Sequence, residues 1–210
     1  GNSYGITASN ISLLGGSGDY SLLANKIAFD STPDDNTLTV NRGSAKITLG
    51  ASLTLSKLTL YGSPTFYSTG TTPASITATT LDLEGTGNYT IPSTGLSFTN
   101  LTVNRGTTTV TLTSNLTSLG TLTVSGLVTF SGSYSIAATT LEVASGSFKL
   151  PASNFNATNI QIDTGATSPP VATETMRTTT NLNANAAIYV APDPNPDTSS
   201  QYQVPVQMYD

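Results

Sequence analysis

The stretch LTVNRGTTTVTLTSNLTSLGT, residues 101–121, shows the pattern that organises the chain. Leu101 and Val103 alternate with polar residues, an Asn-Arg-Gly turn follows, and the alternation then resumes. The next two stretches, residues 122–140 and 141–159, repeat the same order of strand, turn, strand, turn and third apolar pair. Alternation with a period of two is typical of strands that bury one face. The pattern therefore predicts short strands in a fixed succession.

Copies of this unit, each of about 20 residues, fill most of the chain. The copies begin at Ile11, Leu38, Leu58, Leu81, Leu101, Leu122 and Leu141, and a partial copy begins at Ile160. A repeat of this length and alternation is one coil of a β-solenoid, in which each coil buries its side chains against its neighbours. We therefore expect an all-β fold, a single-stranded parallel β-helix of about 7–8 coils with an extended C-terminal tail or hairpin.

The repeat is itself duplicated at a higher level. The stretch NTLTVNRGSAKITL, residues 36–49, aligns with TNLTVNRGTTTVTL, residues 99–112, three coils later. This indicates the duplication of a three-coil block.

The alternation also predicts which side chains form the core and which face outward. The expected first-strand core pairs are Leu38/Val40, Leu58/Leu60, Leu81/Leu83, Leu101/Val103, Leu122/Val124, Leu141/Val143 and Ile160/Ile162. An outward file of second-strand threonines is expected at Thr48, Thr65, Thr90, Thr111 and Thr129. Such a file suits the pleated surface of a sheet, and regular threonine arrays also resemble those of ice-binding proteins.

The composition excludes several classes of function. The chain has 39 threonines and 26 serines, whereas charged residues make up only 9%. Cysteine, histidine and tryptophan are absent, which removes disulfides, thiolate metal sites, the commonest general base and the strongest sugar-stacking ring. The net charge of −5 argues against nucleic acid as a partner. We expect no enzyme activity, no metal, no cofactor and no membrane span.

The C-terminal part departs from the repeat. We divide the chain into a solenoid rod, residues 1–168, and a proline-rich linker with a strand-forming tail, residues 169–210. The candidate assembly residues in this tail are Tyr189, Tyr202, Val204, Val206 and Met208. The tail could fold back on its own rod as a cap or hairpin, add a strand to a neighbouring subunit, or remain a tether.

Acidic and basic residues offer few candidates for catalysis. Asp82 and Glu84 are predicted to face outward two residues apart, but Arg105 reaches the same turn and a solvated ion pair explains them better. Glu142 occupies the same position as Asp82 three coils later, too far away for a shared catalytic step. Arg42 and Arg105 in the two Asn-Arg-Gly turns could grip a polyanion, although turn arginines are usually solvated.

Three further kinds of binding or modification are conceivable. The acids Asp30, Asp34 and Asp35 lack the oxygen spacing of a dedicated calcium loop. Tyr61 and Tyr67 could stack on sugar rings, because tyrosine offers an apolar face with a polar tip. Asn-x-Ser/Thr sequons, the possible glycosylation sites, occur at Asn10, Asn88, Asn100, Asn115 and Asn156.

The LTV-x-G-type turns, the coil of about 20 residues and the Thr/Ser/Asn-rich outer face resemble β-helical bacterial surface proteins of the filamentous haemagglutinin and autotransporter adhesin type. The resemblance covers residues 6–165 and rests on pattern. It implies a secreted, extracellular protein whose signal peptide has been removed, and adhesion or assembly at a cell surface.

From these observations we expect a non-enzymatic structural protein, the protomer of a cell-surface fibre or adhesin shaft that self-associates into a filament through end-coil stacking or C-terminal strand pairing. The alternative is a polysaccharide-attachment module that binds a host or cell-surface glycan through Tyr61 and Tyr67. Ice-binding and polysaccharide-cleaving proteins are the remaining alternatives.

Overall fold

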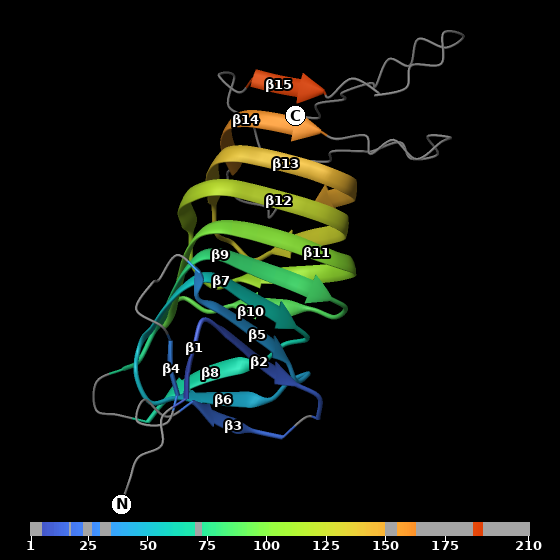
Figure 1. The fold of residues 1–210 in the computed structure, drawn as a ribbon. Coiled ribbons are helices and arrows are strands. Elements are labelled where there is room, and N and C mark those ends of the chain that lie inside the picture. The colour runs from blue at the N-terminus through green and yellow to red at the C-terminus, as the bar shows by residue number, and fades with distance from the viewer. Residues whose placement is uncertain are drawn as a thin grey trace, which may run out of the picture.

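A computed structural model describes residues 6–16, 18–22, 27–29, 35–69, 73–149, 155–162 and 187–190. Strands make up 72% of the structure, and the described residues contain no helix. Figure 1 shows the strands stacked as parallel coils, with β3 near one end of the rod and β15 at the other. The predicted β-solenoid is confirmed.

The strands are short in the N-terminal coils and long in the later ones. In chain order they are β1 (Ile6–Ala8), β2 (Asn10–Leu14), β3 (Tyr20–Leu22), β4 (Ile27–Phe29), β5 (Thr37–Asn41), β6 (Lys46–Leu49), β7 (Leu53–Tyr61), β8 (Thr65–Ser68), β9 (Ile76–Gly85), β10 (Tyr89–Ile91), β11 (Leu96–Leu112), β12 (Leu116–Ser131), β13 (Ile136–Lys149), β14 (Phe155–Ile162) and β15 (Ala187–Val190). Strands β11, β12 and β13 continue around corners where the earlier coils break into separate strands.

Each coil contributes to three faces. The first face is the long sheet, in the order β2-β5-β7-β9-β11-β12-β13-β14-β15, and all of its pairs are parallel. The second face contains β3-β6-β8 in one sheet and β10 paired with the end of β11. The third face contains β1 paired with β4 and the first residues of β7, β9 and β11. About five turns of this coil are described, and strands at both ends continue the first face.

The core forms as the alternation predicts. The expected first-strand residues from Leu38 to Val143 are at most 3% exposed, and they lie on successive rungs in register. Each leucine therefore covers the leucine of the preceding coil, about 4.8 Å away. The side chains of Ile160 and Ile162 lie outside the described residues, although β14 continues the same register.

The predicted threonine file is wrong. In the second face Thr65 pairs with Lys46, and Thr48 pairs with Tyr67. Further along, Thr111 pairs with Thr90 but then with Ser131 instead of Thr129. The turn between the first and second strands varies in length from coil to coil, so counting along each coil shifts two of the five threonines onto another row. These five threonines therefore do not form one regular array.

The tail contributes one further rung to the rod. Strand β15 pairs in parallel with β14, and Ile188 and Val190 continue the rows of Ile160 and Ile162. The boundary at residue 168 therefore separates the repeat from the tail in sequence, whereas at least four residues of the tail belong to the ladder.

Candidate functional site

The Asn-Arg-Gly turn of the interior contains a buried cation. Arg105 is only 1% exposed, and its side chain extends along the rod toward earlier coils. Its Nη1 donates to the carbonyl of Gly87, 2.9 Å away, in the preceding coil. Its Nη2 donates to the carbonyls of Leu60 and Gly62, at 2.9 and 2.7 Å, two coils before. One side chain therefore links three successive coils, through hydrogen bonds from a charged donor to backbone carbonyls.

The surroundings of Arg105 are aromatic and weakly acidic. The guanidinium carbon lies 5.8 Å from the centre of the Tyr89 ring, within the range of a cation–π contact. Burial lowers the pKa of Arg105, while Tyr89 and Glu84 oppose this effect. Burial also raises the pKa of the Tyr89 phenol above its usual range, and the nearby Arg105 charge lowers it in part. The prediction that Arg105 forms a solvated ion pair at the turn is wrong, because carbonyl groups from two other coils enclose it.

The same turn recurs at Arg42, in the coil that follows the first one. Its Nε and Nη2 both donate to the carbonyl of Gly18, at 3.0 and 2.8 Å, and its guanidinium lies 5.8 Å from the Tyr20 ring centre. Gly18 and Tyr20 correspond to Gly87 and Tyr89 in the duplicated block. Tyr20, however, is 38% exposed, whereas Tyr89 is 4% exposed. The turn at Arg42 thus has the hydrogen bonds to the preceding coil, but not the hydrogen bonds that Arg105 makes to a coil two before.

A hydrogen bond from a backbone N–H group to a side-chain oxygen of the preceding coil, here called a corner latch, accompanies each Asn-Arg-Gly turn (Arg turn). The Oδ1 atom of Asn88 accepts from the backbone N–H of Thr109 at 2.8 Å, one coil later. At the equivalent corner the Oδ1 atom of Asp19 accepts from the N–H of Lys46 at 2.9 Å. In each case a side-chain oxygen of one coil satisfies the N–H group of a strand residue in the next coil.

This corner geometry explains most of the predicted sequons. Asn100 and Asn115 accept from the N–H groups of Thr121 and Ser135 at 2.9 and 2.8 Å. Asn10 accepts from the hydroxyl of Thr37. Together with Asn88, these asparagines occupy corners, and the next two positions are an inward apolar residue and an outward Thr or Ser. The coil pattern itself therefore accounts for the Asn-x-Thr/Ser motif at these positions. Asn156 lies in β14, and its side chain lies outside the described residues.

The three candidate carboxylates each have a partner. Asp82 is 4% exposed, and its Oδ2 lies 2.6 Å from Nζ of Lys57, not near Arg105. Both oxygens of Glu84 accept from Nδ2 of Asn104, at 3.2 and 3.1 Å. Glu142 accepts from the hydroxyl of Thr123 at 3.1 Å. These contacts are structural pairs between neighbouring rungs. The calcium candidates Asp30 and Asp34 lie outside the described residues.

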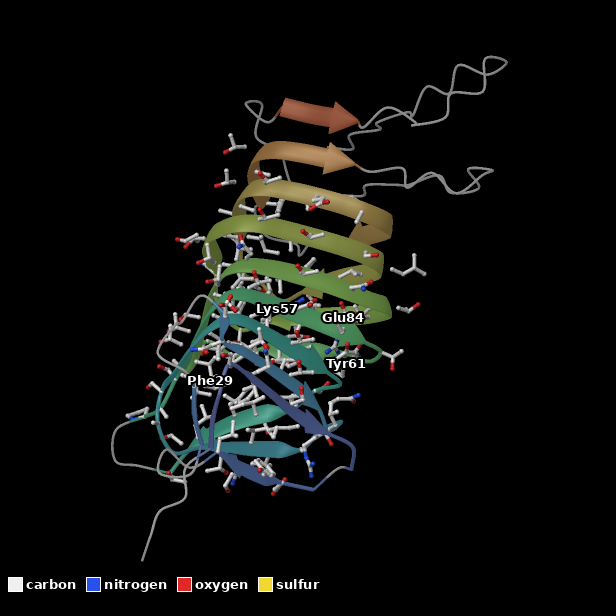
Figure 2. The ribbon with its side chains drawn as sticks, in the orientation of Figure 1. Phe29, Lys57, Tyr61 and Glu84 are labelled. Carbon is white, nitrogen blue, oxygen red and sulfur yellow. The ribbon has the colours of Figure 1, made fainter. Side chains whose placement is uncertain are left out.

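Tyr61 and Tyr67 do not share a surface. Tyr61 lies on the first face, paired with Asn41 and Glu84, and Figure 2 shows it beside Glu84 at the end of the first-face strands. Tyr67 lies on the second face beyond the turn at Gly62, where Nζ of Lys46 covers its ring at 4.3 Å from the centre. The corner of the coil therefore separates the two rings, and stacking of a sugar on either tyrosine stays a prediction.

The predicted assembly residues are only partly described. Tyr189 lies in β15, next to Gln161 in register, and its side chain lies outside the described residues. The remaining candidates, Tyr202, Val204, Val206 and Met208, also lie outside them. At the opposite end of the rod, β2 ends the long sheet, and Leu14 at its last position is 64% exposed. The sequence analysis predicts stacking of end coils but names no residue at this end, although the alignment of residues 6–29 with residues 76–98 could have pointed to them.

A shallow hollow on the outside of the rod lies where the third face meets the first. It is lined by Thr99, Thr117, Ser118, Leu119, Gly120, Ala137, Ala138, Thr139, Ala157 and Thr158. A Cβ atom at Gly120 would lie 2.8 Å from Oδ1 of Asn100, the oxygen of a corner latch. The hydrogen bond of Asn100 at this corner thus explains why residue 120 is a glycine. A bound ligand is not needed to explain it.

Among the described residues, no group of three or more acidic, His or Cys side chains is placed to hold a metal ion. The described part of the chain also includes no helix long and apolar enough to cross a membrane. No protein family model matches the chain, and neither a curated protein nor a solved structure matches it.

Proposed function

We propose that this chain is a non-enzymatic structural protein, a β-solenoid protomer of an extracellular cell-surface fibre or adhesin shaft. The observation that carries this proposal is the outer edge of β2, with which no strand of the described residues pairs. Natural sheets usually protect an edge strand with charge, proline or a covering segment. The sequence of β2, NISLL, contains neither a charge nor a proline.

The opposite end of the rod supports head-to-tail assembly. All first-face strands are parallel, so the last strand of one copy can pair with β2 of the next without changing direction. The two ends are different surfaces, and a contact between different surfaces generates an open fibre unless a rotation closes it into a ring. Pairing of strand edges supplies backbone hydrogen bonds, as in β-augmentation.

Negative-stain microscopy and sedimentation of the full chain over a concentration series test this proposal. Fibres with the width of a single rod, growing with concentration, are expected. Monomers at every concentration would contradict it. The glycan-binding alternative has no specific support, because its two tyrosines lie on different faces of the coil.

A further inference from the structure

The interior Arg105 site shows what a complete Arg turn looks like. It has three layers: the turn itself, the carbonyl of Gly87 one coil before, and the carbonyls of Leu60 and Gly62 two coils before. At the N-terminal end the first two layers are repeated by Arg42 and the carbonyl of Gly18. The described residues contain no coil two before Arg42.

We propose that the N-terminal end of the rod is an acceptor site, completed by the β15 end of a second copy of this chain. This inference rests on the proposed fibre and names its contact surface. The missing layer must present backbone carbonyls to a guanidinium at the end of a parallel first-face strand. A second copy stacked head-to-tail places β15 directly before β2, in the position that β7 holds before β9.

The register identifies the partner atom. In the interior site the Nη2 atom of Arg105 contacts the carbonyl of Leu60. The row of Leu60 runs through the inward position of every later first-face strand and ends at Val190. The carbonyl of Val190 in a second copy therefore corresponds to that of Leu60. In the same register Ile188 and Tyr189 pair with Ile11 and Ser12.

The exposed fractions of side chains at the N-terminal end agree with the lack of a covering coil there. Tyr20 is 38% exposed although its counterpart Tyr89 is 4% exposed, and Leu13 is 6% exposed although later residues of its row such as Leu60 are fully buried. Buried aromatic and arginine side chains are the residue types that anchor protein interfaces. A docked coil would bury the Tyr20 ring and enclose the guanidinium of Arg42, as the interior coils do for Tyr89 and Arg105.

Disulfide trapping in the full chain tests the contact, since the chain has no cysteine of its own. A Ser12→Cys chain is mixed with a Tyr189→Cys chain under mild oxidation. Neighbouring parallel strands lie about 4.8 Å apart, within the range that a disulfide spans. We expect a mixed disulfide dimer. A Thr102→Cys chain, with its cysteine in the middle of the same face, is the control partner for Ser12→Cys and should give only background cross-linking.

The second arm tests the guanidinium. Arg42→Gln, introduced into the Ser12→Cys chain, should weaken association about tenfold or more, as the loss of hydrogen bonds from a charged donor predicts. Lys46→Gln removes a neighbouring cation on the second face and should leave association unchanged. Thermal unfolding of both variants at low concentration verifies that each is folded.

The outcomes separate the two proposals. Fibres without the Ser12–Tyr189 disulfide, and insensitive to Arg42→Gln, would overturn the acceptor site and leave the fibre proposal standing. The disulfide with Arg42 dependence but only dimers would support the acceptor site and contradict the fibre. Absence of any association would overturn both proposals.

Discussion

The two Asn-Arg-Gly turns have the same three residues, but their arginine side chains differ in burial and in hydrogen bonding. Arg105 is buried and bonds to carbonyls of two earlier coils, whereas Arg42 bonds to one and lies beside a ring that is 38% exposed. The local sequence does not decide this difference. It follows from position in the stack, because within the part of the chain that the structure describes only the interior turn has a coil two before it. In a solenoid, the environment of a residue depends on its neighbours along the rod.

The backbone differs between the two turns as well. Strand β5 ends at Asn41 and Gly43 adopts a φ of 59°, whereas β11 continues through the turn and Gly106 is not in the left-handed region. A register shift between Asn104 and Thr107 takes up the extra residue in β11. The interior turn is thus a bulge in a continuous strand, and the end turn is a true break between strands.

The largest expected effect separates the two arginines directly. Arg105→Gln should lower the free energy of unfolding by about 3 kcal/mol, because buried carbonyls lose a charged donor. Arg42→Gln in the monomer should cost about 1 kcal/mol, since its contacts are partly exposed. Urea unfolding at low protein concentration measures both. Equal losses for the two variants would contradict the role assigned to the coil two before.

The glycines of the turns sharpen the comparison. Gly43→Ala should destabilise the rod by about 1 to 2 kcal/mol, because a residue with a Cβ is strained at positive φ. Gly106→Ala should be neutral or slightly stabilising, because its φ is not positive and a Cβ would meet nothing within 4 Å. Thermal unfolding of the two variants checks this order, and a reversed order would show that the two turns have been assigned the wrong backbones.

The buried Tyr89 should make the stability of the rod depend on alkaline pH. The pKa of Tyr89 is raised in the folded state, so its phenol binds the proton more tightly there than in the unfolded chain. The stability that this provides is complete below the unfolded value of about 10 and is lost as the pH rises above it. Tyr89→Phe should therefore flatten the alkaline fall in stability. Urea unfolding between about pH 8 and about pH 11 measures this, and an unchanged alkaline fall in Tyr89→Phe would contradict the role assigned to the buried phenol.

The smallest effect is expected on the outer side of the first face. Asp82 interrupts a row of threonines that includes Thr59 and Thr102, and its buried Oδ1 has no hydrogen-bond partner. Asp82→Thr loses the contact with the half-exposed Lys57 but removes this unsatisfied atom. The unfolding free energy should change by less than about 0.5 kcal/mol. A loss above about 2 kcal/mol would mean that the ion pair is essential to the rod.

Alternation in the sequence was enough to predict the core of the first face. Residues such as Leu58 and Val103 occupy one repeated row, and a shift of one residue would have turned the whole strand inside out. The second face was harder, because the number of residues between the first and second strands varies and its rows cannot be counted from the sequence. Thr65 and Thr129 were misplaced for this reason.

The candidate site could not be predicted in the same way. A turn arginine is solvated in most proteins, and nothing within the turn sequence indicates that Arg105 extends over two coils. Asp82 was predicted to face outward, which is confirmed by its row, but its burial depends on Lys57 of the preceding rung. The corner asparagines likewise had a recognisable glycosylation signal whose structural cause, a bond to the next coil, appears only in three dimensions.

The most direct test compares Arg42→Gln with the unchanged chain at two protein concentrations. At low concentration, where the chain is monomeric, the variant should lose about 1 kcal/mol of unfolding free energy. At high concentration, where a second copy covers the N-terminal end, the loss should approach the value of about 3 kcal/mol expected for Arg105→Gln. A loss that does not change with concentration would contradict the claim that the end turn is an incomplete copy of the interior one.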